Sequence, residues 1–345
     1  QTQSWTSTSS YPNTKLKPER TKSWEVGLDA RILNDISLNL TYYRSNTYNQ
    51  TFYADLSLSS GYSNIPIQSG NIMNEGLEMS LGYNKQWKDF SFNTNYTLTW
   101  NKNRVKRLAD GVYNYATGQP IQMPELSPLT YGHTDARLIL RVGGSMGDVY
   151  GQRLLKRDLN GYILNEEGVG LAMENKETYL GSILPKMNMG WSLGFGYKGV
   201  NLGMTFTGRF GGIVISETQS VLDAAGVSKV SADVRDAGGV QINQSKVSAQ
   251  TYYQTIQGTA AYYTYSATNV RLGELSLSYT LPKKWFDNKV GMTVGLVGKN
   301  LWMIYCKAPF DPELTTSAAS NFYQGFDAYM LPSTRNFGFN VKFQF

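Results

Sequence analysis

Apolar and polar residues alternate with a period of two along much of this chain. From Trp24 to Ile32 every even position is apolar, while the odd positions hold glutamate, glycine, aspartate and arginine. An α-helix has a period of 3.6 residues, which would place Arg31 on the same stripe as Trp24 and Leu28. The segment is therefore predicted to be a β-strand whose successive side chains point to opposite faces.

The same alternation predicts nine strands, over residues 24–32, 36–43, 77–83, 90–100, 187–197, 200–207, 275–281, 290–296 and 337–345. Two further apolar runs, residues 138–142 and 149–155, lie between the fourth and the fifth strand. Because those two strands already run in opposite directions, the stretch between them adds either no strand or two. The prediction is nine strands, or eleven if this pair joins the same sheet.

Strand length and charge distinguish two all-β architectures. Strands of a soluble sandwich average about five or six residues, whereas ten residues tilted by about 45° cover roughly the 25 Å apolar band of an outer-membrane barrel. Charges within the spans fall on the polar face, which otherwise holds serine, threonine, asparagine and glycine. Charges on the apolar face are expected only at strand ends, at Lys22, Arg44, Lys88 and Arg271. This pattern favours an antiparallel transmembrane β-barrel.

The connections alternate between short and long, which gives the barrel an orientation. Short ones are predicted at 33–36, 84–89, 198–199 and 282–288, and long ones at 45–74, 101–184, 211–267 and 303–333. Bacterial barrels have short periplasmic turns and long external loops. The C-terminal residue Phe345 is therefore expected at the periplasmic end.

Composition removes several other classes of protein. Charged residues make up only 17% of the chain, yet no apolar run approaches the roughly 18 residues of a membrane helix. A single cysteine, Cys306, excludes a disulfide framework. A single histidine, His133, leaves little material for histidine catalysis or a zinc site. We expect no enzyme activity, cofactor or metal, and a net charge of +6 does not by itself indicate nucleic-acid binding.

Five short motifs follow one another along the chain and carry a family resemblance. They lie at Leu16–Glu19 with Glu25–Asp29, at Asn71–Glu78, at Val270–Pro282, at Gly298–Leu301 and at Asp311–Glu313. In this order, and over nearly the whole chain, they resemble the late barrel strands of SusC-like (SusC/RagA) TonB-dependent transporters. The closing aromatic residue, Phe345, is also similar to the ends of outer-membrane barrels.

The resemblance implies that residues 1–345 are the C-terminal part, 9–11 strands, of a barrel of about 22 strands. No N-terminal plug, TonB box or early strands are recognisable. The opening Gln1–Trp5 has no leader features, so we expect that a signal has been removed or that an upstream portion is absent.

The same resemblance implies a function and partners. It implies import of a nutrient, an oligosaccharide or a peptide, across the outer membrane of a Gram-negative bacterium. A SusD-like surface lipoprotein would cover the loops, TonB would act on the absent plug, and outer-membrane lipids and lipopolysaccharide would surround the wall. Two alternatives stay open: a scaffold subunit of a larger outer-membrane assembly machine, and a passive porin.

Aromatic residues supply two sets of candidate site residues. Five tyrosines of the longest uninterrupted loop offer stacking area for a sugar or peptide, although packing of that loop on itself or on a partner is the favoured explanation; they are Tyr252, Tyr253, Tyr262, Tyr263 and Tyr265. The preceding residues 217–237 are compatible with a short helix interrupted at Gly226. Five other aromatics near strand ends are predicted to form an interfacial girdle: Trp87, Trp100, Tyr197, Trp285 and Trp302.

Three further motifs have a chemical interpretation beside a simpler one. Gly143–Gly147 satisfies G-x-S-x-G, but the only histidine precedes it, which disfavours a nucleophile elbow and favours a glycine-rich loop. Asp158–Gly161, with Glu166 and Glu167 following, hints at calcium, but the glycine is at the wrong position for an EF-hand and a turn is the default. The basic cluster Lys102, Arg104, Lys106 and Arg107 is either a solvated face or a partner for lipopolysaccharide phosphates.

Overall fold

The computed structural model describes residues 10–11, 16–55, 61–68, 70–108, 125–166, 170–314, 316–317 and 321–345. Glu167 and the opening Gln1–Trp5 lie outside these described residues. No helix among them is long and apolar enough to cross a bilayer.

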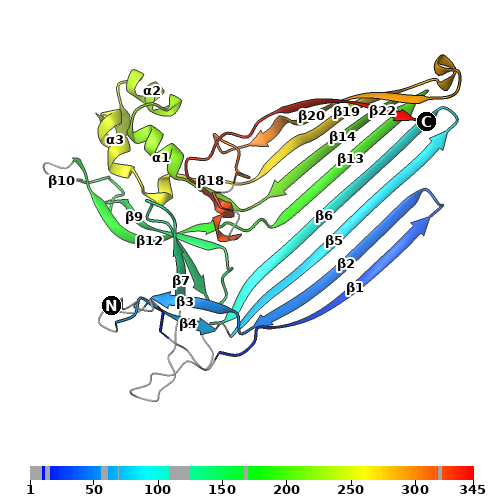
Figure 1. Ribbon diagram of the computed structural model, residues 1–345. Helices are drawn as coiled ribbons and strands as arrows, with labels where there is room; N and C mark the ends of the chain where they lie inside the picture. Colours follow the sequence, from blue (N-terminus) through cyan, green and yellow to red (C-terminus); the bar gives the residue numbers. More distant parts are fainter. Residues whose placement is uncertain are drawn as a thin grey trace, which may run out of the picture.

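A nine-stranded antiparallel sheet dominates the chain (Figure 1). Its strands, in spatial order, are β1 (Arg20–Ile32), β2 (Ile36–Tyr48), β5 (Asn71–Trp87), β6 (Phe90–Arg107), β13 (Met187–Tyr197), β14 (Val200–Phe210), β19 (Asn269–Leu281), β20 (Gly291–Cys306) and β22 (Asn336–Gln344). These are the nine strands that the alternation predicts, with several of them longer than predicted. The sheet is open, with β1 and β22 as its two edges in the part of the chain that the structure describes.

The register of the sheet gathers the apolar positions of all strands on one face. One row runs across five strands, pairing Leu38 with Leu81, Leu81 with Tyr96, Tyr96 with Trp191, and Trp191 with Phe206. Leu81 is 42% exposed and Trp191 is 43% exposed, although both lie in the middle of long strands. A continuous apolar face of this size requires an apolar environment.

The opposite face is mostly polar. The adjacent row pairs Ser80 with Thr97, Thr97 with Gly190, and Gly190 with Thr207. Side chains of this face hydrogen-bond across strands, as in the 3.1 Å contact between Ser80 Oγ and Asn95 Oδ1. Such a face suits a water-filled lumen.

The short turns all lie at one end of the sheet, together with the C-terminus (Figure 1). The turn between β13 and β14 holds Lys198 and Gly199 at φ 45° and 90°. A two-residue type I′ hairpin turn needs positive φ at both central positions, because only then does its twist match that of the strands. The alternation of short and long connections is therefore confirmed.

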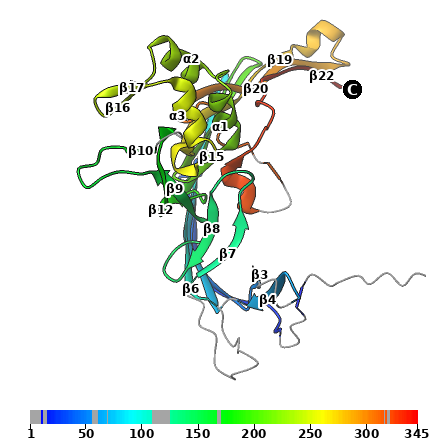
Figure 2. The ribbon, with the colours of Figure 1, turned by 90° about the vertical axis from the view of Figure 1, so that its left-hand side faces the viewer.

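The long connections fold into further structure at the other end (Figures 1 and 2). Residues 138–142 and 149–155 do not join the large sheet but lie in a separate four-stranded one. Nine strands, not eleven, therefore make up the large sheet of the described chain. The four-stranded sheet has the order β12-β9-β8-β7, with β7 (Glu125–Thr130), β8 (Arg137–Arg141), β9 (Asp148–Leu155) and β12 (Met173–Ser182).

The remaining elements are short. The strands pair as β3 (Thr51–Asp55) with β4 (Asn64–Gln68), β10 (Asn165–Glu166) with β11 (Gly170–Leu171), β16 (Val240–Ile242) with β17 (Ser245–Val247), and β15 (Ile213–Ser216) with both β18 (Thr264–Ser266) and β21 (Phe326–Asp327). The helices are α1 (Glu217–Ala224), α2 (Lys229–Asp236) and α3 (Ala249–Ile256), and the 3₁₀ turns are η2 (Ala260–Tyr262), η3 (Lys283–Phe286) and η4 (Asn321–Gly325).

Serine caps explain where the three helices begin. Ser216, Ser228 and Ser248 each accept a hydrogen bond from the backbone N–H three residues later, which satisfies one of the free donors of a helix N-terminus. Gly226, at φ 72°, lies between α1 and α2. The interrupted helix predicted over residues 217–237 is thus confirmed as two helices, whereas α3 was not predicted.

A substitution on the lipid-facing row tests this assignment of faces. We expect Leu81→Arg in the full-length protein to lower the free energy of unfolding by about 2–4 kcal/mol, because it places a charge at mid-membrane depth. The neighbouring control Ser80→Arg points to the polar face and should cost less than about 1 kcal/mol. Urea unfolding in lipid bilayers measures both, and equal losses would contradict the assignment.

Candidate functional site at the loop end of the sheet

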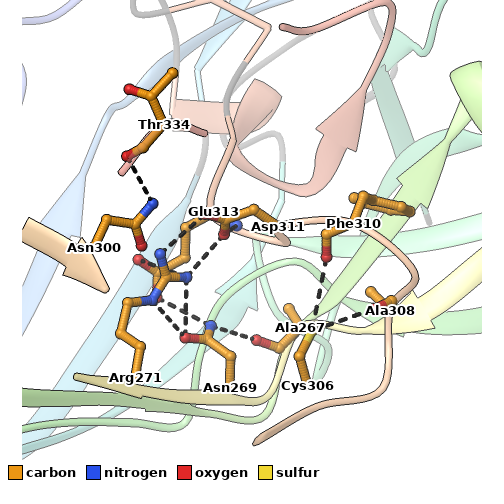
Figure 3. A network of polar contacts seen from close by, with 10 residues as sticks. All are labelled: Ala267, Asn269, Arg271, Asn300, Cys306, Ala308, Phe310, Asp311, Glu313 and Thr334. Carbon is orange, nitrogen blue, oxygen red and sulfur yellow. Dashed lines mark hydrogen bonds and ion pairs between the residues drawn. The ribbon is translucent and has the colours of Figure 1, made fainter. Parts of the chain in front are cut away.

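A buried ion-pair network ties the last long connection to the sheet (Figure 3). The Arg271 guanidinium makes two hydrogen bonds to the Asp311 carboxylate, of 3.0 and 2.8 Å, and a third of 3.2 Å to Asn269 Oδ1. Asn269 in turn donates to Glu313 Oε1 at 3.0 Å. Planar, two-point contacts of this kind fix the orientation as well as the distance between the groups.

The loop member of this network, Asp311, has its pKa set by two opposing effects. Burial by itself raises the pKa of Asp311. Its hydrogen bonds with the Arg271 guanidinium and the Glu313 N–H outweigh burial and hold the pKa below the ordinary value of a carboxyl group. The carboxylate is therefore charged at neutral pH and keeps the loop in place.

Arg271 corrects one prediction from the sequence. Strict alternation from Leu275 assigns Arg271 to the apolar face. The pairing of β14 with β19 has a bulge next to Gly273, so that Leu272 stays on the apolar face beside Phe206 while Arg271 pairs with Thr207 on the polar face. One extra residue shifts the parity of everything beyond it, and the charge reaches Asp311 instead of lipid.

The five candidate tyrosines converge in one small core of the external structure. Tyr253 and Tyr263 are buried, at 7% and 2% exposure, among residues that include Leu155 and Ile256. The Tyr262 hydroxyl accepts a 3.0 Å hydrogen bond from the Leu155 backbone N–H. This placement favours packing within the loop structure for the two buried rings. Contact with a ligand stays a prediction for the half-buried Tyr252, Tyr262 and Tyr265.

Burial also changes the acidity of these phenols. It raises the pKa of Tyr265 to about 12, with a smaller contribution from Asp223. It raises the pKa of Tyr252, Tyr253 and Tyr263 as well. The four rings are therefore neutral at physiological pH and act as hydrogen-bonding or stacking groups, not as bases.

The motifs with a possible catalytic or metal-binding role form an ordinary loop and an ordinary turn. Gly143–Gly147 connects strand β8 to strand β9 and precedes no helix, so it is a glycine-rich loop. Asp158 Oδ1 accepts hydrogen bonds from the N–H groups of Asn160 and Tyr162, both at 2.9 Å, which makes a turn. No cluster of three metal-ligating side chains occurs among the described residues. His133 and Cys306 take no part in such a site.

A cavity of about 720 Å³ lies at the rim where β6 separates from β13. Its lining comes from four segments, at Trp100–Arg104, Gly143–Asp148, Tyr179–Lys186 and Gly211–Ile213. Three basic residues are part of this lining: Lys102, Arg104 and Lys186. The alternating pattern of the strands gave no signal for this cavity, because three of its four segments lie outside the predicted strands.

Comparison with known proteins identifies the family. The β-barrel model described as "TonB dependent receptor-like, beta-barrel" matches residues 2–301. The chain belongs to this family.

Curated relatives agree with this family. TonB-dependent receptor P3 of Formosa agariphila is 26% identical over 363 residues, and receptor P26 of the same organism is 24% identical over 371 residues. Each alignment covers 96% of this chain and 35% of the relative. The chain thus spans about a third of the length of the receptors that it matches.

Solved structures show the same fold. The RagAB peptide importer in its "open-open" state matches with a TM-score of 0.66 and 20% identity, covering 97% of this chain and 35% of that chain. Its "closed-closed" state matches with a TM-score of 0.65 and 18% identity, covering 94% of this chain and 35% of that one. The predicted family of TonB-dependent receptors is therefore confirmed, and the fold is that of the SusC-like barrel in the RagAB importer.

As part of a TonB-dependent receptor barrel, the chain lies in the outer membrane, and its family transports rather than catalyses. The five girdle aromatics lie toward both ends of the sheet, with Trp87, Tyr197 and Trp285 next to the turns. Four of the five are well exposed, between 47% and 62%, while Trp100 is half-buried. Their contact with the membrane interface stays a prediction.

Breaking the buried network should loosen the last long connection. We expect Arg271→Gln or Asp311→Asn in the full-length receptor to speed proteolytic cleavage between residues 307 and 335 by about tenfold or more, since an unpaired buried partner costs about 3–5 kcal/mol. The double variant should be cleaved no faster than either single variant.

Arg141→Gln is the matched control. Arg141 also bonds two carboxylates, Glu125 and Glu177, each at 2.6 Å, but at an exposed site. Exposed pairs contribute about 0–1 kcal/mol, so cleavage should change little. Mass spectrometry of the fragments measures these rates, and equal rates in all variants would contradict a structural role for the buried pair.

Proposed function

We propose that the full-length protein imports a nutrient, an oligosaccharide or a peptide, and that this chain forms the C-terminal part of its barrel wall and external loops. The fold shared with the RagAB peptide importer carries this proposal. A SusD-like surface lipoprotein covers the loop end, and TonB acts through a plug that this chain does not contain.

The two open edges of the sheet support the proposal that this chain forms only part of a barrel. The outer edges of β1 and β22 have no ladder partner among the described residues. Unpaired backbone groups exposed to lipid cost several kcal/mol each, so spanning sheets close on themselves. In the full-length protein these two edges therefore pair with further strands of the same barrel.

The loop end offers a surface for a lid protein. Helices α1 and α2 and the turn between them carry three exposed aliphatic residues, Leu222, Val227 and Val230, with exposures of 39%, 69% and 49%. Apolar residues gathered at the centre of an interface contribute most of the binding energy. These helices are our candidate contact for the lipoprotein.

Energy dependence of uptake tests the transport proposal. Cells that carry the full-length gene should take up a labelled oligosaccharide or peptide mixture, and deletion of the gene or of TonB should abolish uptake of one class. A passive porin would continue to work after collapse of the proton-motive force. A scaffold subunit would leave uptake unchanged and copurify with many unrelated proteins, and either result would reject the importer.

Charge substitution on α1 and α2 tests the contact with the lid. Val227→Glu with Val230→Glu should reduce copurification of the lipoprotein at least about tenfold, because buried, unpaired carboxylates are costly in an interface. The control Leu33→Glu makes the same change at an exposed position in a turn at the opposite end of the sheet. Quantitative mass spectrometry of the purified complex gives the ratio, and unchanged recovery would place the contact elsewhere.

A further inference from the structure

The rim cavity forms where the backbone ladder between β6 and β13 ends. The last bond on this side joins the Asn101 N–H to the Lys186 carbonyl at 3.1 Å. Beyond it, the edge of β6 pairs with the loop between β8 and β9 instead. Two backbone hydrogen bonds of 2.8 Å join Val105 to Gly143 and Gly144. The wall therefore splits at this point, and the cavity of about 720 Å³ lies in the split.

The lining of the rim cavity is cationic. Lys102, Arg104 and Lys186 line it against a single carboxylate, that of Asp148. Arg104 and Lys186 make no ion pair with any residue that the structure describes, and Lys102 has only a 3.7 Å contact with Glu75. Two of the three cations are therefore available to a ligand.

The one carboxylate is already engaged. Asp148 accepts hydrogen bonds from the Tyr179 hydroxyl at 3.2 Å and from the Ser145 N–H at 2.8 Å. Burial raises the pKa of Asp148 despite these bonds. Both effects keep Asp148 from acting as a counter-ion: burial disfavours its charged form, and it makes no ion pair with Lys102, Arg104 or Lys186 among the described residues.

The register of β6 shows which side of the wall these cations occupy. Trp100, Lys102 and Arg104 are alternate residues of a strand that stays in regular register with β5 as far as the pair of Met73 with Arg104. They therefore share the face of Leu98, which belongs to the apolar, lipid-facing side. Lys102 and Arg104 stand directly above the end of the apolar band, on the loop side that faces out of the cell, whereas Lys186 borders the cavity opposite Asn101.

A ligand in this position meets two kinds of surface. Its polar part lies among guanidinium and ammonium groups, which bind phosphate oxygens strongly. Its lower part reaches Trp100 and the apolar face. An amphiphile fits both surfaces, whereas a free anion uses only the first.

We propose that the rim cavity binds the phosphate-bearing headgroup of an outer-leaflet glycolipid of the lipopolysaccharide class, whose acyl chains lie along Trp100 and the apolar face. The binding does not depend on what the barrel transports. Lipid retention and nutrient uptake are separate measurements, so the two proposals fail separately.

Lipid retained by the purified full-length receptor tests the site. We expect Arg104→Glu to reduce the lipopolysaccharide that copurifies from outer membranes in mild detergent by about tenfold, and Lys102→Glu with Arg104→Glu to reduce it further. The matched control is Lys106→Glu, an exposed residue of the same strand, two positions beyond Arg104, that does not line the cavity. Native mass spectrometry counts lipids per barrel and confirms that each variant is folded.

Two competing ligands define the opposing outcomes. Phosphatase-treated lipopolysaccharide should bind the wild type and the double variant equally weakly, and millimolar inorganic phosphate should not displace the intact lipid. Displacement by phosphate alone would make this a site for free anions and overturn the proposal. Equal lipid retention in Arg104→Glu and Lys106→Glu would overturn it as well, whatever happens to nutrient uptake.

Discussion

Backbone pairing in register is the constraint on which the rest of this structure depends. In the bilayer core an unpaired N–H or C=O costs several kcal/mol, so each strand must pair along its length. A slip of one residue would also turn every apolar side chain of that strand toward water. The row through Leu38, Leu81, Tyr96 and Trp191 shows that register and apolar face agree from strand to strand. The flat polar face and the short turns follow from the same pairing.

The surfaces proposed to bind partners and ligands lie at the end of the sheet where continuous backbone pairing stops. Beyond the apolar band the chain is free to leave the ladder: the connection from β6 to β13 forms a second sheet and the rim cavity, and the connection from β14 to β19 forms the three helices. The bulge next to Gly273 alters the large sheet itself near this end, and it turns Arg271 inward to hold Asp311. The wall supplies rigidity, and the loop end supplies the surfaces that partners and ligands meet.

Many of the candidate site residues could be located in the sequence, but their roles could not be decided from it. The tyrosines from Tyr252 to Tyr265 were recognisable as a group, yet only the folded loop shows that Tyr253 and Tyr263 fill a core. The basic cluster was recognisable too, but Lys186, which lies across the cavity from Lys102 and Arg104, is more than eighty residues away from these two in the chain. Separations of this length carry no local pattern.

The sequence by itself determined the strands, their faces and the direction of the turns, because a period of two and the turn residues are local properties that lipid and water enforce strand by strand. It also determined the family, through motifs such as Gly298–Leu301 and Asp311–Glu313. Only the tertiary structure decided the number of strands in the wall, the face of Arg271 and the rim cavity. Those depend on where ladders end and bulge, and such endings are set by contacts between segments far apart in the chain.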